Sequence, residues 1–234
     1  MSIIVSHPRP ILYPQMLRNL LNTVLNLLLP HRCFGCRRSG TVLCERCASM
    51  RESADPLDAP DTYALFAYRD PVVQKMIWAL KYRGVQAVGE QLGARLYDYL
   101  AEDLADATLL GGGDQNWLVI PIPLAPARER TRGFNQATAI ARGLVQRGGG
   151  NFILAENILR RARDTGSQTE IRKRAKRLAN MRNAFAVVNP EVARGKQIII
   201  IDDVITTGGT MMEAWRALAR AGAKIVISAA VAHG

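Results

Sequence analysis

The sequence predicts an α/β fold, in which a mostly parallel sheet is flanked by helices and a small cysteine-rich module precedes it. Short β-branched runs alternate with segments of helical periodicity, which is typical of strands joined by crossover helices. Residues 198–201 are four isoleucines, and a strand that is apolar at every position suits the centre of a sheet covered on both faces. With 234 residues, 48% of them hydrophobic, the chain is long enough for a main domain and a small second one.

The elements are expected in the following order. Apolar residues at helical spacing predict an amphipathic helix over 17–28, which Pro30 ends; it packs on the protein body, or contacts a membrane surface or a partner. Residues 54–60, rich in Pro, Asp and Ala, indicate a linker, so we place the domains at 1–60 and 61–234. The predicted strands are 62–68, 117–122, 184–188, 197–201 and 224–231. The predicted helices are 72–82, 88–100, 137–145 and 211–221, with a glycine loop at 111–113.

The basic charge of the chain is concentrated in one segment. The net charge is +11, from 31 basic and 20 acidic residues. Residues 128–182 hold 14 basic and 4 acidic residues, or +10, which leaves 17 and 16, or +1, for the rest of the chain. Such a segment indicates an anionic partner, either nucleic acid, a phosphorylated ligand or an acidic surface. A solvated basic face is the alternative for residues 171–180.

Composition also excludes several classes of protein. The apolar fraction excludes disorder throughout. The most apolar stretch, residues 16–29, contains arginine and asparagines and is shorter than the ~20 residues of a membrane span. The start of the chain lacks the basic and cleavage regions of a signal peptide. All cysteines lie between Cys33 and Cys47, unlike a disulfide framework, and we therefore expect a cytoplasmic protein.

Four cysteines form the pattern Cys33-x2-Cys36, seven residues, then Cys44-x2-Cys47. Each pair sits on a tight turn that can direct two thiolates at one point, and two such turns make the tetrahedral sulfur site that zinc accepts. An iron–sulfur centre, or redox-active or unpaired thiols, are the alternatives. Because four thiolates close the coordination sphere, the zinc would be structural.

A phosphate-binding turn is predicted where the isoleucine run is followed by Asp202 and Asp203. Backbone N–H groups of a Thr/Gly-rich turn that opens a helix form an anion cradle, and glycines allow close backbone approach. A ribose 5-phosphate suits this site, because the turn binds the phosphate and the acids bind the vicinal hydroxyls. A nucleoside triphosphate loop of the form G-x4-G-K-[ST] is absent. The predicted phosphate ligands are Thr206, Thr207, Gly208, Gly209 and Thr210.

Residues 198–210 resemble the complete phosphoribosyl pyrophosphate (PRPP) signature of type I phosphoribosyltransferases. Further stretches narrow the resemblance: L-K-Y-R-G at 80–84, R-T-R-G-F-N-Q-A at 130–137, R-x-R-D-T-x-x-Q at 161–168 and R-x-x-N-x-x-N-A-F at 177–185. Together with the cysteine module, they are similar to the competence-associated, GntX-like ComF family from about residue 17 to the C-terminus. The resemblance implies a type I phosphoribosyltransferase fold and a link to competence and DNA uptake.

The resemblance also implies roles for residues of this chain. Asp202 and Asp203 would hold the ribose hydroxyls directly or through Mg²⁺, and equal roles for them require the strand to end there, because adjacent strand residues face opposite sides. The loop after strand 117–122 would face the pyrophosphate, and residues 160–177 would form a mobile hood. The pyrophosphate ligands would be Arg128, Arg130 and Arg132. The hood residues would be Arg161, Arg163 and Gln168.

Three functions are compatible with this sequence. The first is Mg²⁺-dependent phosphoribosyl transfer to an acceptor that the sequence does not identify, by displacement at the anomeric carbon. The second is a non-catalytic PRPP-binding accessory of DNA uptake, and the third is a PRPP-sensing regulator. Single-stranded DNA or another nucleic acid is a possible partner of the Arg-rich segment. Few aromatic residues interleave that segment, so DNA contact there is expected to be electrostatic.

Overall fold

The computed structural model describes residues 31–59, 61–111, 116–161 and 184–234. The helix expected at 17–28 and the predicted hood residues Arg163 and Gln168 lie outside the described residues. The chain divides into two compact units, Met1–Cys47 and Ala48–Gly234, which are described separately below. No helix in the described part of the chain is long and apolar enough to cross a bilayer.

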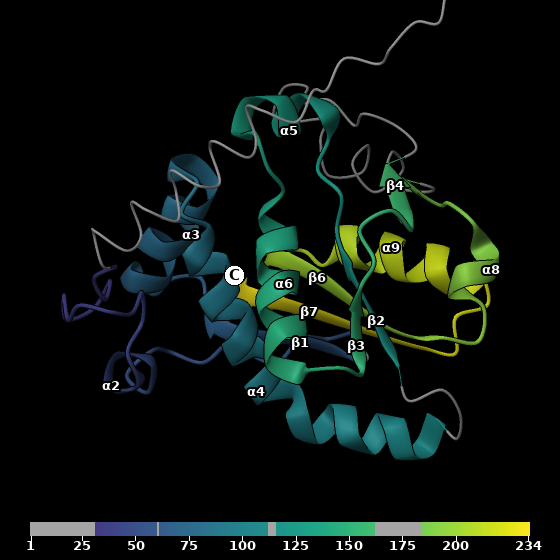
Figure 1. Ribbon diagram of the computed structural model, residues 1–234, viewed down its shortest axis with the longest axis horizontal. Coiled ribbons are helices and arrows are strands. Elements are labelled where there is room, and N and C mark those ends of the chain that lie inside the picture. Colours follow the sequence, from purple (N-terminus) through teal and green to yellow (C-terminus); the bar gives the residue numbers. More distant parts are fainter. Residues whose placement is uncertain (1–30, 60, 112–115, 162–183) are drawn as a thin grey trace, which may run out of the picture. The chain divides into compact units, whose positions relative to one another are not determined.

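A five-stranded sheet forms the centre of the larger unit (Figure 1). Its strand order is β1-β7-β6-β2-β3, and every neighbouring pair is parallel. The expected mostly parallel sheet is therefore confirmed. The strands are β1 (Thr62–Ala67), β2 (Trp117–Pro121), β3 (Phe152–Leu154), β6 (Gln197–Ile205) and β7 (Ile225–His233).

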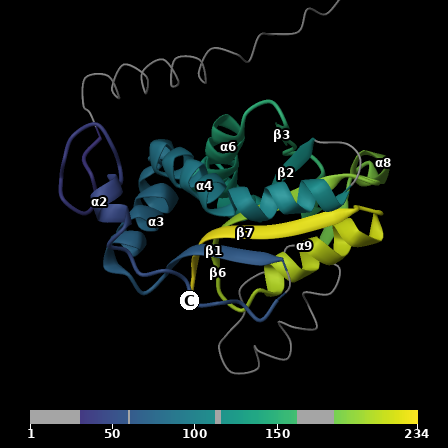
Figure 2. The same ribbon diagram turned by 90° about the horizontal axis from the view of Figure 1, so that it is seen from below.

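Helices cover both faces of this sheet (Figure 2). On one side of the central strand β6, Ile198 and Ile200 pack in a cluster with Met211 and Leu218. The alternate isoleucines of β6 face the opposite layer, since successive strand residues point to opposite faces. The cluster side is covered by α9 (Gly209–Arg220). The other side is covered by α3 (Pro71–Arg83), α4 (Gln86–Gly111) and α6 (Gln136–Gly148).

The first helix of that layer, α3, begins at a well-defined cap. The Asp70 carboxylate accepts hydrogen bonds from the N–H groups of Val72, at 2.8 Å, and Val73, at 3.3 Å. Both of its oxygens also lie 3.2 Å from the Arg51 guanidinium. Burial raises the pKa of Asp70, but these donors outweigh burial and lower it. The charged cap fixes the start of α3, and with it the position of the residues at its carboxyl end.

Two helices of the same layer, α4 and α6, cross with their backbones in contact. A Cβ added at Gly93 would lie 1.9 Å from the carbonyl oxygen of Ile140. A Cβ added at Gly143 would lie 1.9 Å from the carbonyl oxygen of Glu90. Neither separation is possible for real atoms, so both positions require glycine for this crossing.

Several predicted boundaries differ from those observed. The helix predicted to end at residue 100 continues to Gly111, because buried leucines continue at helical spacing through Leu104. The strand expected at 184–188 is β5 (Phe185–Val187), which pairs antiparallel with β4 (Leu159–Arg161) in a separate two-stranded sheet. The structure also contains short elements that were not predicted. They are the helices α2 (Glu45–Ala48), α5 (Pro126–Arg132) and α8 (Pro190–Ala193) and the strands β3 and β4.

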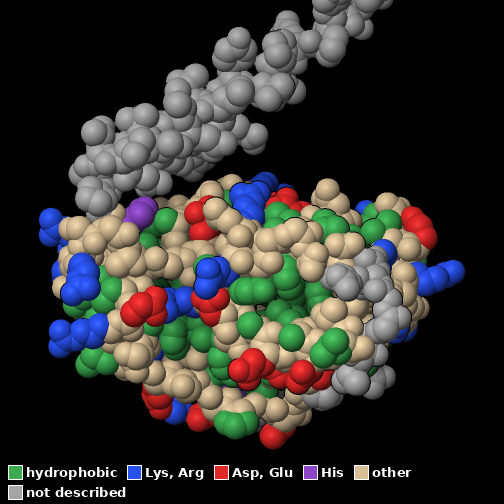
Figure 3. Space-filling view, turned by 60° about the horizontal axis from the view of Figure 1, so that its bottom comes forward, with side chains coloured by type: hydrophobic (Ala, Val, Ile, Leu, Met, Phe, Trp, Pro, Cys, Tyr) green, Lys and Arg blue, Asp and Glu red, His purple; other side chains and the backbone are tan. Residues whose placement is uncertain are grey.

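The division between the units falls between Cys47 and Ala48. Residues 48–59, which include 54–59 of the expected linker 54–60, belong to the larger unit. There the N–H group of Ala67 donates to the carbonyl of Glu52, and Ser53 forms a bridge with Phe66. On the face seen in Figure 3, basic, acidic and apolar side chains are interspersed, so the basic excess of the chain forms no continuous patch over the described residues there.

Candidate functional site

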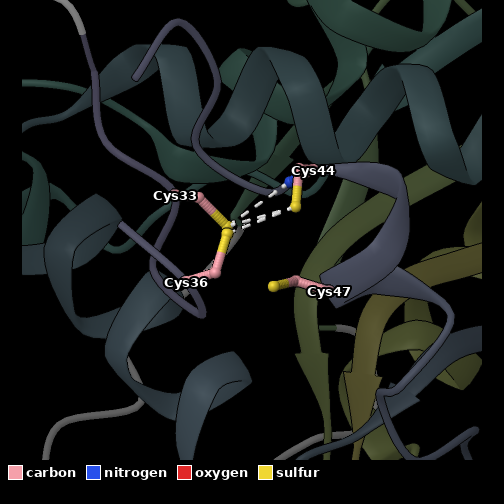
Figure 4. A group of neighbouring side chains, drawn as sticks. All are labelled: Cys33, Cys36, Cys44 and Cys47. Atoms are coloured by element: carbon pink, nitrogen blue, oxygen red, sulfur yellow. Dashed lines mark hydrogen bonds between the residues drawn. The ribbon is translucent and has the colours of Figure 1, made fainter. Parts of the chain in front are cut away.

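Four cysteine thiols converge in the smaller unit (Figure 4). Their sulfur atoms all lie within 4.8 Å of one another. The Sγ–Sγ distance is 3.8 Å between Cys33 and Cys44, and 3.6 Å between Cys36 and Cys44. Tetrahedral zinc with Zn–S bonds of about 2.3 Å separates its ligands by about 3.8 Å. No disulfide joins these four cysteines, and their geometry can hold one zinc ion.

The backbone around the cysteines prepares the thiols for a cation. Burial raises the pKa of Cys33, but N–H groups of Cys36, Cys44 and Gly35 outweigh burial and lower it to about 6. In contrast, burial and the neighbouring thiols raise the pKa of Cys47 to about 12. A dication at this point would favour the thiolate form of all four.

Glycine at position 35 is required by the packing of this cluster. A Cβ there would lie 2.7 Å from the Sγ of Cys47 and 3.0 Å from its Cβ. Cys47 itself is held on the short helix α2 (Glu45–Ala48). Any larger residue at position 35 would therefore displace one of the four sulfur atoms.

The two predicted acids of the larger unit lie inside β6, not at its end. Strand β6 continues to Ile205, because its pairing with β7 extends from Asp202↔Ala230 to Ile205↔His233. The expectation that the strand ends at the acids is therefore wrong, and the two carboxylates face opposite sides of the sheet. They have different surroundings and are not equivalent.

Asp203 faces the layer of α3. Its residue is 8% exposed, and its carboxylate lies 2.8 Å from the Nζ of Lys81 at the carboxyl end of α3. Asp202 accepts a hydrogen bond of 2.8 Å from the N–H group of Asp203. Burial, and next the charge of Asp203, raise the pKa of Asp202 to about 7, against the opposing effect of Lys81 and Arg161. The site thus holds one paired carboxylate and one that titrates near neutrality.

The predicted phosphate turn connects β6 to α9. Residues 206–208 leave the strand, and Gly208 caps the helix with φ 70° and ψ −7°. This left-handed conformation favours glycine. The side chains of Thr206 and Thr207 are exposed, and residues Gly209 and Thr210 begin the first turn of α9. The first N–H groups of a helix of this length point toward the carboxyl edge of the sheet, where they can bind an anion.

The segment expected to be a loop facing pyrophosphate contains the helix α5, capped at Gly133 with φ 74°. Helical geometry puts Arg128 and Arg132 one turn apart on one side and Arg130 about 160° away. Arg128 and Arg130 are exposed and form no ion pair with another described residue. The Arg132 guanidinium donates to the Gln136 side chain at 2.7 Å and lies 5.5 Å from the ring centroid of Tyr82. Arg132 is thereby brought to the end of α3.

The R-G-F-N-Q run has a structural explanation as the corner between α5 and α6. The Asn135 side chain accepts a hydrogen bond from the N–H group of Ala137 at 3.0 Å, which caps α6. The same side chain donates to the carbonyl of Ile122 at 2.9 Å, and so ties this corner to the end of β2. Gln136 is buried and fixes Arg132. The motif therefore sets the position of an arginine beside the sheet edge.

Arg161 is the one predicted hood residue that the structure describes. It lies at the end of β4, and its Nε donates to the carbonyl of Pro123 at 2.9 Å. Its guanidinium also lies 5.1 Å from the ring centroid of Phe185. Sequence reasoning missed Lys81, although it noted the stretch that contains it. The only signal was a lysine among apolar residues near the end of a predicted helix.

Comparisons with known proteins agree with this geometry. The phosphoribosyl transferase domain model matches residues 130–234. Competence protein ComFC of Bacillus subtilis (strain 168) is 26% identical over 207 residues, which cover 87% of this chain and 78% of that protein.

Two further relatives match over a shorter region. DNA utilization protein YhgH of Escherichia coli O157:H7 is 33% identical over 111 residues, and Competence protein F of Haemophilus influenzae is 31% identical over 105 residues. These matches span less than half of each relative, 45% and 44%. Together with the parallel sheet and the cysteine cluster, these matches make the chain similar to phosphoribosyltransferase-like proteins of the ComF family.

Proposed function

We propose that this protein binds PRPP with Mg²⁺ at the carboxyl edge of its sheet and supports DNA uptake in the cytoplasm. The observation that carries the proposal is the junction of β6 and α9, where two differently placed carboxylates lead into a glycine-capped helix start. The names of the relatives, which refer to competence and DNA utilization, support the biological part. Four thiols that need a reducing compartment support the location.

Each part of PRPP has a candidate partner in this arrangement. The 5′-phosphate binds the turn Thr206–Thr210, where exposed hydroxyls and helix N–H groups donate hydrogen bonds. Asp202 and Asp203 approach the ribose hydroxyls from opposite faces of β6, so their roles toward the ribose differ. Oxygen donors of this kind suit Mg²⁺, which, when bound, neutralises the diphosphate and activates it as a leaving group.

Basic side chains around the edge would neutralise the diphosphate. Arg132 is held toward the end of α3, and Arg128 lies one turn before it on the same side of α5. Lys81 is paired with Asp203, so it offsets the charge of that carboxylate and leaves the arginines to neutralise the diphosphate. The opposite direction of Arg130 on α5 makes it the weakest of the three predicted pyrophosphate ligands.

Two modes of action follow from the same bound ligand. In a transferase, an acceptor nucleophile forms a bond to the anomeric carbon as the carbon–oxygen bond to pyrophosphate breaks, and pyrophosphate leaves with the electron pair. In a non-catalytic accessory or a PRPP-sensing regulator, binding of PRPP alone changes the protein. The cysteine cluster binds one structural zinc ion in either mode.

Calorimetric titration with PRPP and Mg²⁺ tests the ligand site. Wild-type protein should bind, and Asp203→Asn should weaken binding by about 100-fold, the effect of removing one charge-assisted contact of ~3 kcal/mol. Asp98→Asn is the matched control, because it removes a carboxylate that pairs with Arg147 on the distant α4–α6 surface. Unchanged affinity in Asp203→Asn, with the thermal transition preserved, would refute the site. Release of pyrophosphate in the presence of nucleobases or nucleic acid then separates a transferase from an accessory.

A further inference from the structure

An exposed aromatic pair lies on α3, one turn apart along the helix. Trp78 is 50% exposed and Tyr82 is 64% exposed. Their ring centroids are 5.7 Å apart, with an angle of 45° between the ring planes. Large aromatic side chains gain free energy when they are buried, so adjacent exposed rings of this size indicate a binding surface.

Guanidinium groups flank both rings. The Arg83 guanidinium lies 4.9 Å from the centroid of Trp78, and that of Arg132 lies 5.5 Å from the centroid of Tyr82. One arginine comes from the end of α3 and the other from α5, so two elements distant in sequence build one surface. Cation–π contacts of this kind keep the guanidinium groups close to the ring faces.

The charge around the pair is strongly positive. Together α3 and α5 carry six basic residues and one acidic residue, Glu129. Lys75 precedes Trp78 by three residues, which places it on the same face of α3, and both are exposed. The surface formed by Lys75, Trp78, Tyr82, Arg83 and Arg132 is here termed the α3 platform.

We infer that the α3 platform binds single-stranded nucleic acid. Unpaired bases expose π-faces that stack on aromatic rings, while lysine and arginine neutralise the phosphates that join them. Bases inside a duplex are already stacked and cannot use the rings. Tryptophan, tyrosine and arginine are also enriched in protein–protein interfaces, so the choice of partner rests on charge. The six basic residues and one acidic residue of α3 and α5 favour a polyanion with aromatic groups.

The platform adjoins the proposed PRPP site. Tyr82 follows Lys81, whose ammonium group contacts Asp203, and Arg132 belongs to both sets of residues. The inference rests on the proposed role in DNA uptake for its biological meaning, while the platform itself is defined by exposure, stacking and charge. The rings that would contact nucleic acid therefore belong to α3 and not to the Arg-rich segment, residues 128–182, where the sequence predicted the contact.

Fluorescence anisotropy with labelled oligothymidylate tests the inference on the full-length protein. Wild type should bind, and Trp78→Ala and Tyr82→Ala should each weaken binding by about 5- to 150-fold, the effect of losing one stacked base. Because these changes remove no charge, the salt dependence of the remaining binding should keep its slope. Tyr99→Ala, at an equally exposed position on α4, is the matched control and should bind as wild type does.

Binding of other ligands shows whether the inference fails. Equal binding by Trp78→Ala and wild type would overturn the inference, as would tighter binding of duplex DNA or of polyglutamate than of oligothymidylate. Saturation by thymidine monophosphate at the same concentration would also overturn it, because the platform would then be a nucleotide site. Calorimetry with PRPP and Mg²⁺ on Trp78→Ala distinguishes this failure from failure of the proposed function, since Trp78 has no assigned contact to PRPP.

Discussion

The cysteine cluster and the carboxyl edge of the sheet bring chemical groups together in different ways. The cluster draws all its ligands from fifteen consecutive residues, Cys33–Cys47. The sheet edge combines Lys81, Arg132, Arg161 and the β6–α9 junction, which are far apart in the sequence. A local site can be recognised from spacing alone, whereas the composition of the edge depends on how strands and helices are ordered.

The two regions also differ in the interactions that stabilise them. Among residues 31–47, the described part of the smaller unit, the buried apolar side chains near the cysteines are chiefly Val42 and Leu43, so a metal ion would supply much of the stability of this part. The edge rests on a central strand whose four isoleucines are fully buried. Changes made in the two regions should therefore differ in how strongly they affect the protein and in the physical cause of the effect.

Metal removal should have the largest effect. Structural zinc contributes about 10–16 kcal/mol to the folding of small zinc modules at neutral pH. A strong chelator should release one zinc ion per chain and abolish hydrogen-exchange protection of the amides of Cys33 and Gly40, which donate backbone hydrogen bonds. Amides of β6 serve as the internal control and should stay protected. Retained protection at Cys33 in metal-free protein would contradict a zinc-held unit.

A methyl group at the α4–α6 crossing should have the next largest effect. Gly143→Ala places a Cβ against the carbonyl of Glu90, and the helices must separate, which we expect to destabilise the protein by about 3 kcal/mol. Denaturant unfolding measures the change. Gly150→Ala is the control, because its Cβ would meet no atom within 4 Å, and it should alter stability by no more than about 0.5 kcal/mol. Equal stability of the two variants would refute the tight crossing.

Removal of the lysine at the sheet edge should have a smaller effect on stability. Lys81→Met keeps the apolar stem and leaves the buried Asp203 carboxylate without its ammonium partner, which should destabilise the protein by about 2 kcal/mol. The double variant Lys81→Met/Asp203→Asn should recover much of this loss in thermal unfolding. No recovery would show that Lys81 acts through packing and not through its charge.

The carboxyl edge should also show a dependence on pH that the cysteine cluster does not explain. The pKa of Asp202 is raised to about 7, so folding favours its protonated form, and this stabilisation is lost as pH rises from about 4 to about 7. Ligand binding to the ionised carboxylate should show the opposite trend. The affinity for PRPP with Mg²⁺ should rise by up to about tenfold per pH unit below pH 7 and then level off. Asp202→Asn should reduce the pH dependence of the PRPP affinity measured by calorimetry. If the variant and wild type show the same pH dependence, it arises from titration of PRPP and not from Asp202.

Sequence patterns predicted the parts of the molecule that depend on local chemistry. The spacing of four cysteines predicted the cluster that the structure contains, and the alternation of elements predicted the parallel sheet. The run from the isoleucines to Thr210 predicted the strand, turn and helix start, and its role in binding PRPP stays a prediction. The helix α5 was missed because the resemblance implied a loop after strand 117–122. The continuation of β6 through its acids was missed because only pairing with β7 makes that strand extend to Ile205.

Other features depended on tertiary structure. Trp78 and Tyr82 fit an apolar helical pattern, and only the packing of α3 shows that they are exposed. The ion pair of Lys81 with Asp203 joins residues from a helix and from the central strand, so no spacing could indicate it. Glycines within predicted helices gave no sign of a crossing, because the partner backbone lies on a different helix.

The most direct test of the account is a structure of the protein with PRPP and Mg²⁺ bound. The account predicts the 5′-phosphate on the turn Thr206–Thr210, the ribose hydroxyls at Asp202 and Asp203, and the diphosphate on the side of Arg128 and Arg132. PRPP bound elsewhere, or a turn that remains without phosphate at saturating PRPP, would contradict it.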